Sequence, residues 1–173
     1  MVNHNDDQFT TGTWRLDPDR TTITATATKL GFYSVPATLH LTEGTIEVDD
    51  NQRVTSVAVT ADANSYTSKS STRDRHVRGA KFLDSNSYPE LIFRADEVLA
   101  RPDGYSSTGT ISVKGSPSPL RFEVRDVRMD GSAASFRAHA TLDRRAIGLN
   151  ATPAFVVATT IALDVDVVAH HST

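Results

Sequence analysis

Apolar and polar side chains alternate one by one along most of the chain, and this period constrains the fold more than any other feature. The clearest case is residues 120–128, where Leu120, Phe122 and Val124 alternate with charged side chains. A period of two is typical of β-strands with one face buried and the other in water. The segments with this pattern are 22–29, 39–48, 54–61, 91–96, 105–113, 120–128, 134–142 and 161–167. The chain is therefore predicted to be all-β.

The predicted strands need cover for their apolar faces. Turn sequences rich in Asp, Pro and Gly separate them at residues 49–51, 101–104 and 114–119. A set of about eight such strands buries its apolar faces either as a sandwich or as a closed antiparallel barrel. Closure would also remove the exposed strand edges that an open sheet leaves. The alternation itself fits both architectures.

Residues 66–93 interrupt this rhythm and predict a short helical insertion around residues 71–82. Ser70 and its hydroxyl neighbours are good N-cap residues, because a short hydroxyl accepts from the free backbone N–H groups of a first helical turn. Asp74 would lie in that first turn, near the positive end of the helix dipole. Val77 and Phe82 are expected to contact a core. Pro89 ends the irregular region before the next strand.

The chain of 173 residues is long enough for one domain with a sizeable core, which we place at residues 13–169. Residues 1–12 are predicted to be a disordered lead-in, and residues 170–173 a polar tail. The N-terminal residues lack the pattern of a secretory signal, and no apolar run approaches the roughly 20 residues that span a bilayer. We therefore expect a cytoplasmic protein without a membrane-spanning segment.

Composition excludes several kinds of chemistry. The formal net charge is −3, which gives no sign of a nucleic-acid partner, and the chain has no cysteine for disulfides or thiolate sites. Its six histidines lack metal-ligand spacing, and no Gly-rich phosphate loop or Gly-x-Ser-x-Gly elbow is present. We expect no metal and no catalytic residue. The oligomeric state stays open, with a homodimer among the alternatives.

Basic side chains gather in the helical insertion: Lys69, Arg73, Arg75, Arg78 and Lys81. One interpretation is a solvated loop whose charges pair with nearby carboxylates and contribute little. The other is a cationic rim that holds a phosphate or polar head group at the mouth of a pocket. Arg144 and Arg145 would join this rim if their loop lies at the same end. The candidate head-group residues are Arg73, Arg78 and Lys81.

Small side chains recur on the predicted inward faces: Ala25, Ala27, Ala134, Ala138 and Ala140. They leave room inside a barrel unless larger neighbours such as Phe122 and Leu163 fill it. A barrel of about eight strands has an interior just large enough for packed side chains or for one ligand. The residues predicted to line the lumen are Ile23, Ala25, Phe93, Ile111, Phe122, Phe136 and Ile161.

The insertion also carries a long, irregular motif that resembles the signature of the YceI-like, polyisoprenoid-binding family. It reads Thr72-Arg73-Asp74-x-His76-Val77-Arg78-x-x-x-Phe82-Leu83-Asp84-x-x-x-Tyr88-Pro89-x-x-x-Phe93. Further blocks that resemble this family are found at residues 14–23, 109–122 and 142–148 and in the final strand. The similarity thus extends in order from Trp14 to Ala169.

The resemblance implies an extended antiparallel β-barrel of lipocalin-like form, with the helical insertion framing a pocket. It also implies a bound lipid in the lumen, either a polyisoprenoid chain or an isoprenoid quinone, and carries over no catalytic residue. The chain departs from the family pattern near this lumen. Ala25 replaces a usual Phe, Lys29 replaces a usual His, and Ala37-x-Leu39 replaces a usual Gly-x-Phe.

The leading hypothesis is a non-catalytic barrel that carries a long apolar small molecule of isoprenoid type and needs no cofactor. One alternative is an enzyme that acts on a small apolar substrate in the same cavity. It would need His139, Asp96 or Glu123 inside the barrel, and the alternation places all of them outside. The other alternative is an interaction module whose barrel core is packed with side chains.

Overall fold

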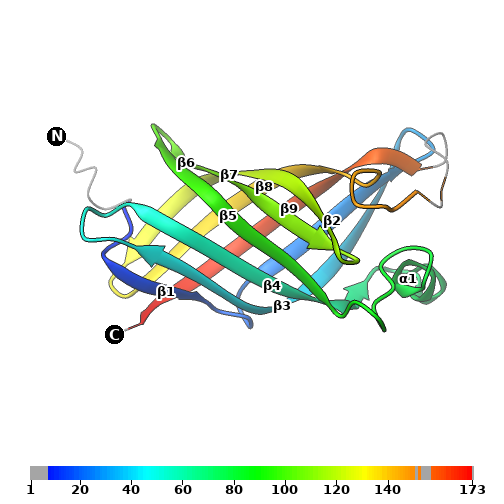
Figure 1. Cartoon of the computed structure of the whole chain (residues 1–173), viewed down its shortest axis with the longest axis horizontal. Helices are drawn as coiled ribbons and strands as arrows, with labels where there is room; N and C mark the ends of the chain where they lie inside the picture. Colours follow the sequence, from blue (N-terminus) through cyan, green and yellow to red (C-terminus); the bar gives the residue numbers. More distant parts are fainter. Residues whose placement is uncertain (1–7, 151, 153–156, 173) are drawn as a thin grey trace.

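The computed structural model describes residues 8–150, 152 and 157–172 of the chain. The elements in this part are β1 (Gly12–Leu16), β2 (Thr22–Lys29), β3 (Tyr33–Val48), β4 (Val54–Thr67), α1 (Ser71–Arg78), β5 (Glu90–Arg101), β6 (Gly104–Val113), β7 (Ser116–Asp130), β8 (Ala133–Asp143) and β9 (Val157–Ser172). The strands form one long tube, and α1 lies at the end opposite to β1 (Figure 1). No helix in the described part of the chain is long and apolar enough to cross a membrane.

The strands form a single antiparallel sheet that closes on itself. Their order is β1-β3-β2-β9-β8-β7-β6-β5-β4, and pairing of β3 with β4 completes the ring. The short strand β1 and the strand β2 share one position in this ring, because both pair with β3 on one side and with β9 on the other. The prediction of an all-β, extended antiparallel barrel with a short helical insertion is confirmed.

Several strands are longer than the alternation predicted. β3 begins at Tyr33, and its first residues, up to Ala37, pair with β2 alone. Pro36 lies in this segment, where one side of the strand has no partner and a missing N–H group costs little. The predicted polar tail at residues 170–173 is wrong for residues 170–172, which belong to β9. There the N–H group of His171 donates to the carbonyl oxygen of Ser132 at 2.7 Å, and His170 Nε2 lies 2.9 Å from Asp17 Oδ2.

The end of the barrel near β1 is closed by aromatic rings. Phe9 is 3% exposed, and its ring centroid lies 5.4 Å from that of Trp14 and 5.8 Å from that of Phe136, both in edge-to-face geometry. The Trp14 indole N–H donates to the carbonyl oxygen of Thr10 at 2.9 Å. The lead-in predicted to be disordered is therefore ordered from residue 8 onward, because Phe9 is needed as a core residue. Residues 1–7 lie outside the described part.

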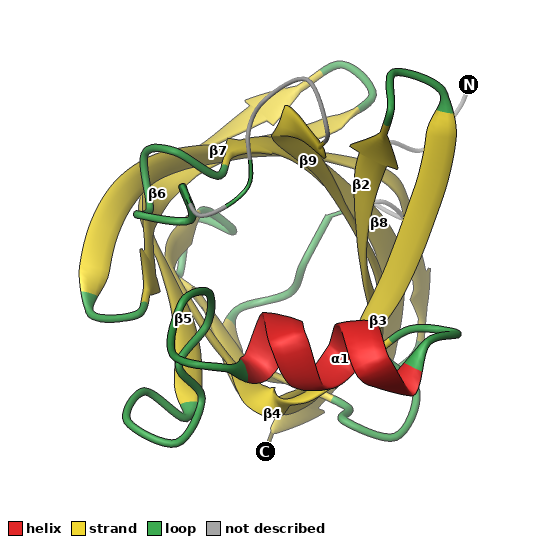
Figure 2. Ribbon diagram, turned by 90° about the vertical axis from the view of Figure 1, so that its right-hand side faces the viewer, coloured by secondary structure: helices red, strands yellow, loops and turns green. Residues whose placement is uncertain are grey.

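The helix α1 crosses the other end of the barrel (Figure 2). Ser70 caps it by accepting a hydrogen bond from the N–H group of Arg73 at 3.2 Å, as its position in the sequence predicts. The helix ends at Arg78, four residues before the predicted boundary at residue 82. Gly79 leaves the helical conformation, and turns closed by hydrogen bonds such as Leu83 N–H to Val77 C=O at 2.9 Å follow it.

Asp74 joins α1 to the end of β4. Its buried carboxylate accepts hydrogen bonds from the Ser68 hydroxyl at 2.6 Å and from the Ser68 N–H group at 2.9 Å. The bond from the Ser68 hydroxyl is the main reason why the pKa of Asp74 lies below its ordinary value, and the positive charges of Arg78 and Arg73 add to the effect. The ionised carboxylate therefore holds the helix against the rim of the barrel.

Replacing Phe9 by alanine is expected to lower the free energy of unfolding by about 3 kcal/mol, because it removes a buried ring and leaves a cavity in the closed end. Denaturant unfolding measures this change. The matched control is Phe32→Ala, which removes a ring that is 74% exposed and should change the free energy by less than about 0.5 kcal/mol. Equal effects of the two substitutions would contradict the role of Phe9 as a core residue.

Asp74→Asn is expected to destabilise the protein at neutral pH and to matter less in acid. A group with a lowered pKa in the folded state stabilises fully above its unfolded pKa, near 4, and loses this effect as the pH falls through the folded value. The difference in unfolding free energy between wild type and variant should therefore shrink below about pH 4. A difference that stays constant from pH 7 to pH 3 would show that the charge of Asp74 contributes nothing.

Candidate functional site

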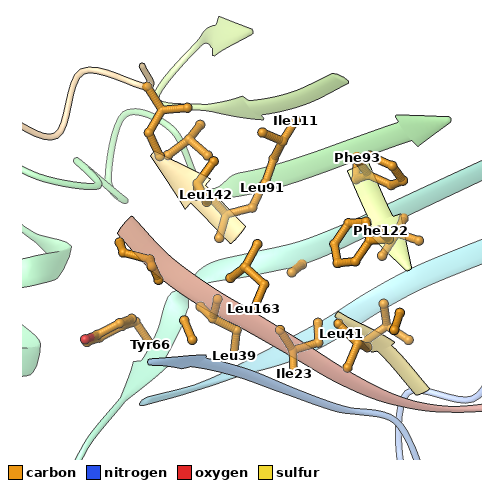
Figure 3. A pocket seen from close by; sticks show the side chains of 18 of the residues that line it. Ile23, Leu39, Leu41, Tyr66, Leu91, Phe93, Ile111, Phe122, Leu142 and Leu163 are labelled. Atoms are coloured by element: carbon orange, nitrogen blue, oxygen red, sulfur yellow. The ribbon is translucent and has the colours of Figure 1, made fainter. Parts of the chain in front are cut away.

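An elongated cavity of about 410 Å³ occupies the inside of the barrel. Every strand from β1 to β9 contributes side chains to its wall, because the period of two turns every second residue inward in a closed sheet. Figure 3 shows these side chains converging from opposite strands; those labelled are hydrocarbon except for the hydroxyl group of Tyr66. The volume falls within the range of roughly 300–1,000 Å³ that is typical of pockets for one small ligand.

The structure brings together the residues that were predicted to line the lumen. The wall of the cavity includes all of Ile23, Ala25, Phe93, Ile111, Phe122, Phe136 and Ile161. Phe93 and Phe122 meet edge to face on this wall, with ring centroids 4.9 Å apart. Phe122 and Leu163, the large residues that could have filled the space left by the alanines, line the open cavity instead.

Further wall residues were not named from the sequence. Leu39 and Leu41 on β3, and Val57 and Val59 on β4, line the same cavity. The alternation was enough to predict these four as wall residues, because the two members of each pair lie on the same face of a predicted strand. Tyr66 had no such signal, because it follows the alternating part of β4. Burial raises the pKa of its phenol, and the nearby carboxylate of Asp74 raises it further.

The end of the cavity beneath α1 is polar and positively charged. A shallow hollow on the surface adjoins the cavity there, and the two share Lys29, Arg73 and His76 as wall residues. The remaining residues of the hollow are Ser70, Thr72 and Arg75. We call the four basic residues Lys29, Arg73, Arg75 and His76 the cationic mouth.

The candidate head-group residues are only partly brought to this mouth. Arg73 lines both the cavity and the hollow, whereas Arg78 and Lys81 line neither. Lys81 lies in the turns after α1 and is exposed, because the helix ends earlier than predicted. The Nε atom of Arg78 is buried without a hydrogen-bond partner among the described residues, and its charge acts on Asp74. Sequence reasoning had placed Arg75 in the basic cluster but not among the head-group residues.

Arg144 is a buried wall residue whose guanidinium group holds the backbone around it in place. It is 4% exposed, and its guanidinium group donates to the carbonyl oxygens of Leu149 at 2.7 Å, Thr152 and Val157 at 2.8 Å, and Ala158 at 3.0 Å. These bonds tie the segment after β8 to the start of β9. Arg145, which was expected beside it, is exposed and forms an ion pair with Asp143 at 3.1 Å.

The ionisable side chains in the described cavity wall are basic residues and the phenols of Tyr66 and Tyr105. No Asp or Glu is among the wall residues that the structure describes, while Lys29, Arg73, His76 and Arg144 are. The acid–base candidates of the enzyme hypothesis lie elsewhere: His139 Nδ1 is 2.7 Å from Asp164 Oδ1 on the outer surface, and Asp96 and Glu123 are absent from this described wall. The described residues also contain no cluster of three side chains suited to a metal ion.

One polar atom lies deep in the cavity. The Ser107 hydroxyl on β6 belongs to the wall, is buried, and has no hydrogen-bond partner among the described residues. An unpaired buried hydroxyl normally costs stability. The cavity thus offers a ligand two distinct polar places: the cationic mouth and, apart from it, this hydroxyl without a partner among the described residues.

Comparison with known proteins connects this geometry to a family. A UPF0312 protein of Pectobacterium atrosepticum is 31% identical over 84 residues, which are 48% of this chain and 44% of that protein. A UPF0312 protein of Yersinia pestis is 33% identical over 82 residues, which are 47% of this chain and 43% of that protein. In each of these curated relatives, the match therefore spans less than half of the length.

Solved structures share the barrel across most of the chain. BcnA of Burkholderia cenocepacia superposes with a TM-score of 0.78 at 19% identity, covering 88% of this chain and 98% of that one. A polyisoprenoid-binding domain from Saccharophagus degradans, implicated in plant cell wall breakdown, superposes with a TM-score of 0.66 at 13% identity and covers 92% of this chain and 98% of that one. At these identities the superpositions show a common fold.

The family assignment itself comes from the sequence. The model of the YceI-like domain matches residues 14–169, which is nearly all of the closed barrel together with α1. The range agrees with the resemblance that the motif at residues 72–93 first indicated. The chain therefore belongs to the YceI-like family.

Proposed function

We propose that this protein binds a long apolar lipid of isoprenoid type, a polyprenyl chain or an isoprenoid quinone, in the lumen of the barrel and does not convert it chemically. The observation that carries the proposal is the cavity, which is lined by hydrocarbon from every strand. The likeness to the Saccharophagus degradans domain, which is described as polyisoprenoid-binding, supports the choice of ligand class. Its fold is the one described above.

The shape of the wall favours a flexible chain over a compact molecule. The cavity extends from Phe9 at the closed end to Arg73 and His76 beneath α1, and so follows the long axis of the barrel. Each methylene group of a chain that leaves water contributes about 0.8 kcal/mol. A long chain thus gains enough from burial to bind without specific polar contacts along its length, which matches a wall made of Leu, Val, Ile, Ala and Phe.

The wall also supports binding over catalysis. General acid–base chemistry needs a group that lies within reach of the reacting atoms. The basic wall residues lie at the α1 end, and the middle of the cavity is formed by side chains such as Leu41, Phe93 and Leu163. A chain that lies there meets a surface suited to holding it rather than to changing it.

Filling the lumen should weaken binding. Ala138 on β8 lies beside Val124 of β7 and Val165 of β9 in the sheet, and all three line the cavity. Ala138→Phe therefore places a ring in the path of the chain. We expect its affinity for geranylgeraniol, measured by isothermal titration calorimetry, to fall at least about tenfold, because displacing two or three methylene groups removes roughly 2 kcal/mol.

The matched control for this experiment is Thr141→Phe, which adds a ring on the exposed face of the same strand. This variant should bind as wild type does. Denaturant unfolding of both variants shows that each is folded, since overpacking usually costs about 1–3 kcal/mol. Wild-type affinity in Ala138→Phe, or no binding of geranylgeraniol by wild type, would contradict the proposed function.

A further inference from the structure

We infer that the lipid held in the lumen carries an anionic head group, a phosphate or carboxylate, and that the cationic mouth binds this head. The inference rests on the proposed function, because it needs a tail in the lumen. It adds the chemical class of the head, the direction in which the ligand lies, and the residues that select it.

The first support is the continuity of the two hollows. Lys29 at the end of β2 and Arg73 on α1 belong to both the cavity and the surface hollow. A chain that fills the lumen therefore ends among these side chains. Its terminal group would lie where the apolar wall gives way to water, which is where an amphiphile places its polar end.

The second support is an excess of positive charge without a counter-ion. Lys29 and Arg75 form no ion pair or side-chain hydrogen bond with any residue that the structure describes. Arg73 donates only a long bond of 3.3 Å to the Ser68 hydroxyl. Neither described lining contains an Asp or a Glu. Positive charges that converge on a hollow in this way favour a negatively charged ligand.

Asp74 is the acid on the same helix and does not neutralise this mouth. Its carboxylate is buried and accepts three hydrogen bonds from Ser68, at 2.6–3.0 Å, and it is absent from both linings. Its charge acts on Arg73 and Arg78. Lys29 and Arg75 remain available, and an arginine beside a phosphate forms charge-assisted, often bidentate, hydrogen bonds.

Charge also decides which of the two polar places holds the head. An anion beside Ser107 would lose its hydration deep in a hydrocarbon wall and gain one hydroxyl hydrogen bond. Burying an ionised group without a charged partner is far more costly than burying a neutral polar group. A neutral head is able to lie at Ser107, whereas an anionic head is stable only at the mouth.

The test compares two lipids with one tail. Affinities for geranylgeranyl phosphate and for the neutral alcohol geranylgeraniol are measured by calorimetry on wild type and on the double variant Lys29→Gln/Arg75→Gln. We expect wild type to bind the phosphate at least tenfold more tightly than the alcohol. The double variant should lose that advantage and keep its affinity for the alcohol.

The matched control is Lys69→Gln/Lys81→Gln, which removes the same charge from exposed positions of the same segment that line neither hollow. It should change both affinities by less than about twofold. Inorganic phosphate alone should bind far more weakly than the lipid phosphate. Ser107→Ala should keep the preference of wild type for the phosphate over the alcohol, because the anionic head does not lie beside that hydroxyl.

Several results would overturn the inference. Equal binding of alcohol and phosphate by wild type would show that the head is not selected by charge. If Ser107→Ala loses the preference for the phosphate while Lys29→Gln/Arg75→Gln keeps it, the head lies beside Ser107 and not at the cationic mouth. Inorganic phosphate that binds as tightly as the lipid would make the mouth an ion site unconnected with the lumen. If the alcohol also fails to bind, the proposed function falls together with the inference.

Discussion

Closure of the sheet is the constraint on which the rest of the structure depends. The pairing of β3 with β4 leaves the long strands without a free edge along most of their length, and it turns one face of the sheet into an enclosed interior. Each strand must then be apolar at every second position, because that side chain points into the enclosed interior. This requirement explains why a wall built from nine separate strands has almost uniform chemistry. It also explains why the basic side chains of the wall lie at the end of the barrel near α1.

The interior of such a ring stays open here because several inward side chains are too small to reach the opposite wall. A barrel of about eight strands is close to the size at which side chains alone fill the middle. Ala25, Ala27 and Ala138 lie on the wall at positions where a larger residue would reach across. The two ends then differ in kind: Phe9 and Trp14 close one with buried rings, and α1 with its basic side chains borders the other. A tube that is closed at one end and charged at the other gives a bound chain a direction.

The sequence predicted the wall well because inward orientation follows from a local period. Ile23, Phe93 and Ile161 were placed correctly without any knowledge of which strands are neighbours. The cationic mouth was harder to predict, because its residues come from the end of a strand and from a helix, and no sequence period relates the two. Lys29 is the last residue of the predicted strand 22–29, and only the fold places it beside Arg73 and Arg75. Lys81 was misplaced for the opposite reason: the helix that would have carried it ends at Arg78.

The ends of the chain show the same limit. Phe9 lies in a polar segment, and its burial depends on the ring of Phe136, which comes from a distant part of the sequence, as well as on that of nearby Trp14. His170 and His171 read as a terminal tail, yet the pairing of β9 with β1 and β8 continues through them. Local composition indicates neither contact, because both are supplied by tertiary structure.

The central claim is that the lumen holds a long apolar molecule. Native mass spectrometry of the protein as purified from its cells, before and after organic extraction, tests it most directly. The account predicts a non-covalent adduct that extraction removes and whose mass is that of an isoprenoid lipid. A bare protein mass that gains nothing when polyprenyl lipids or isoprenoid quinones are added would contradict it.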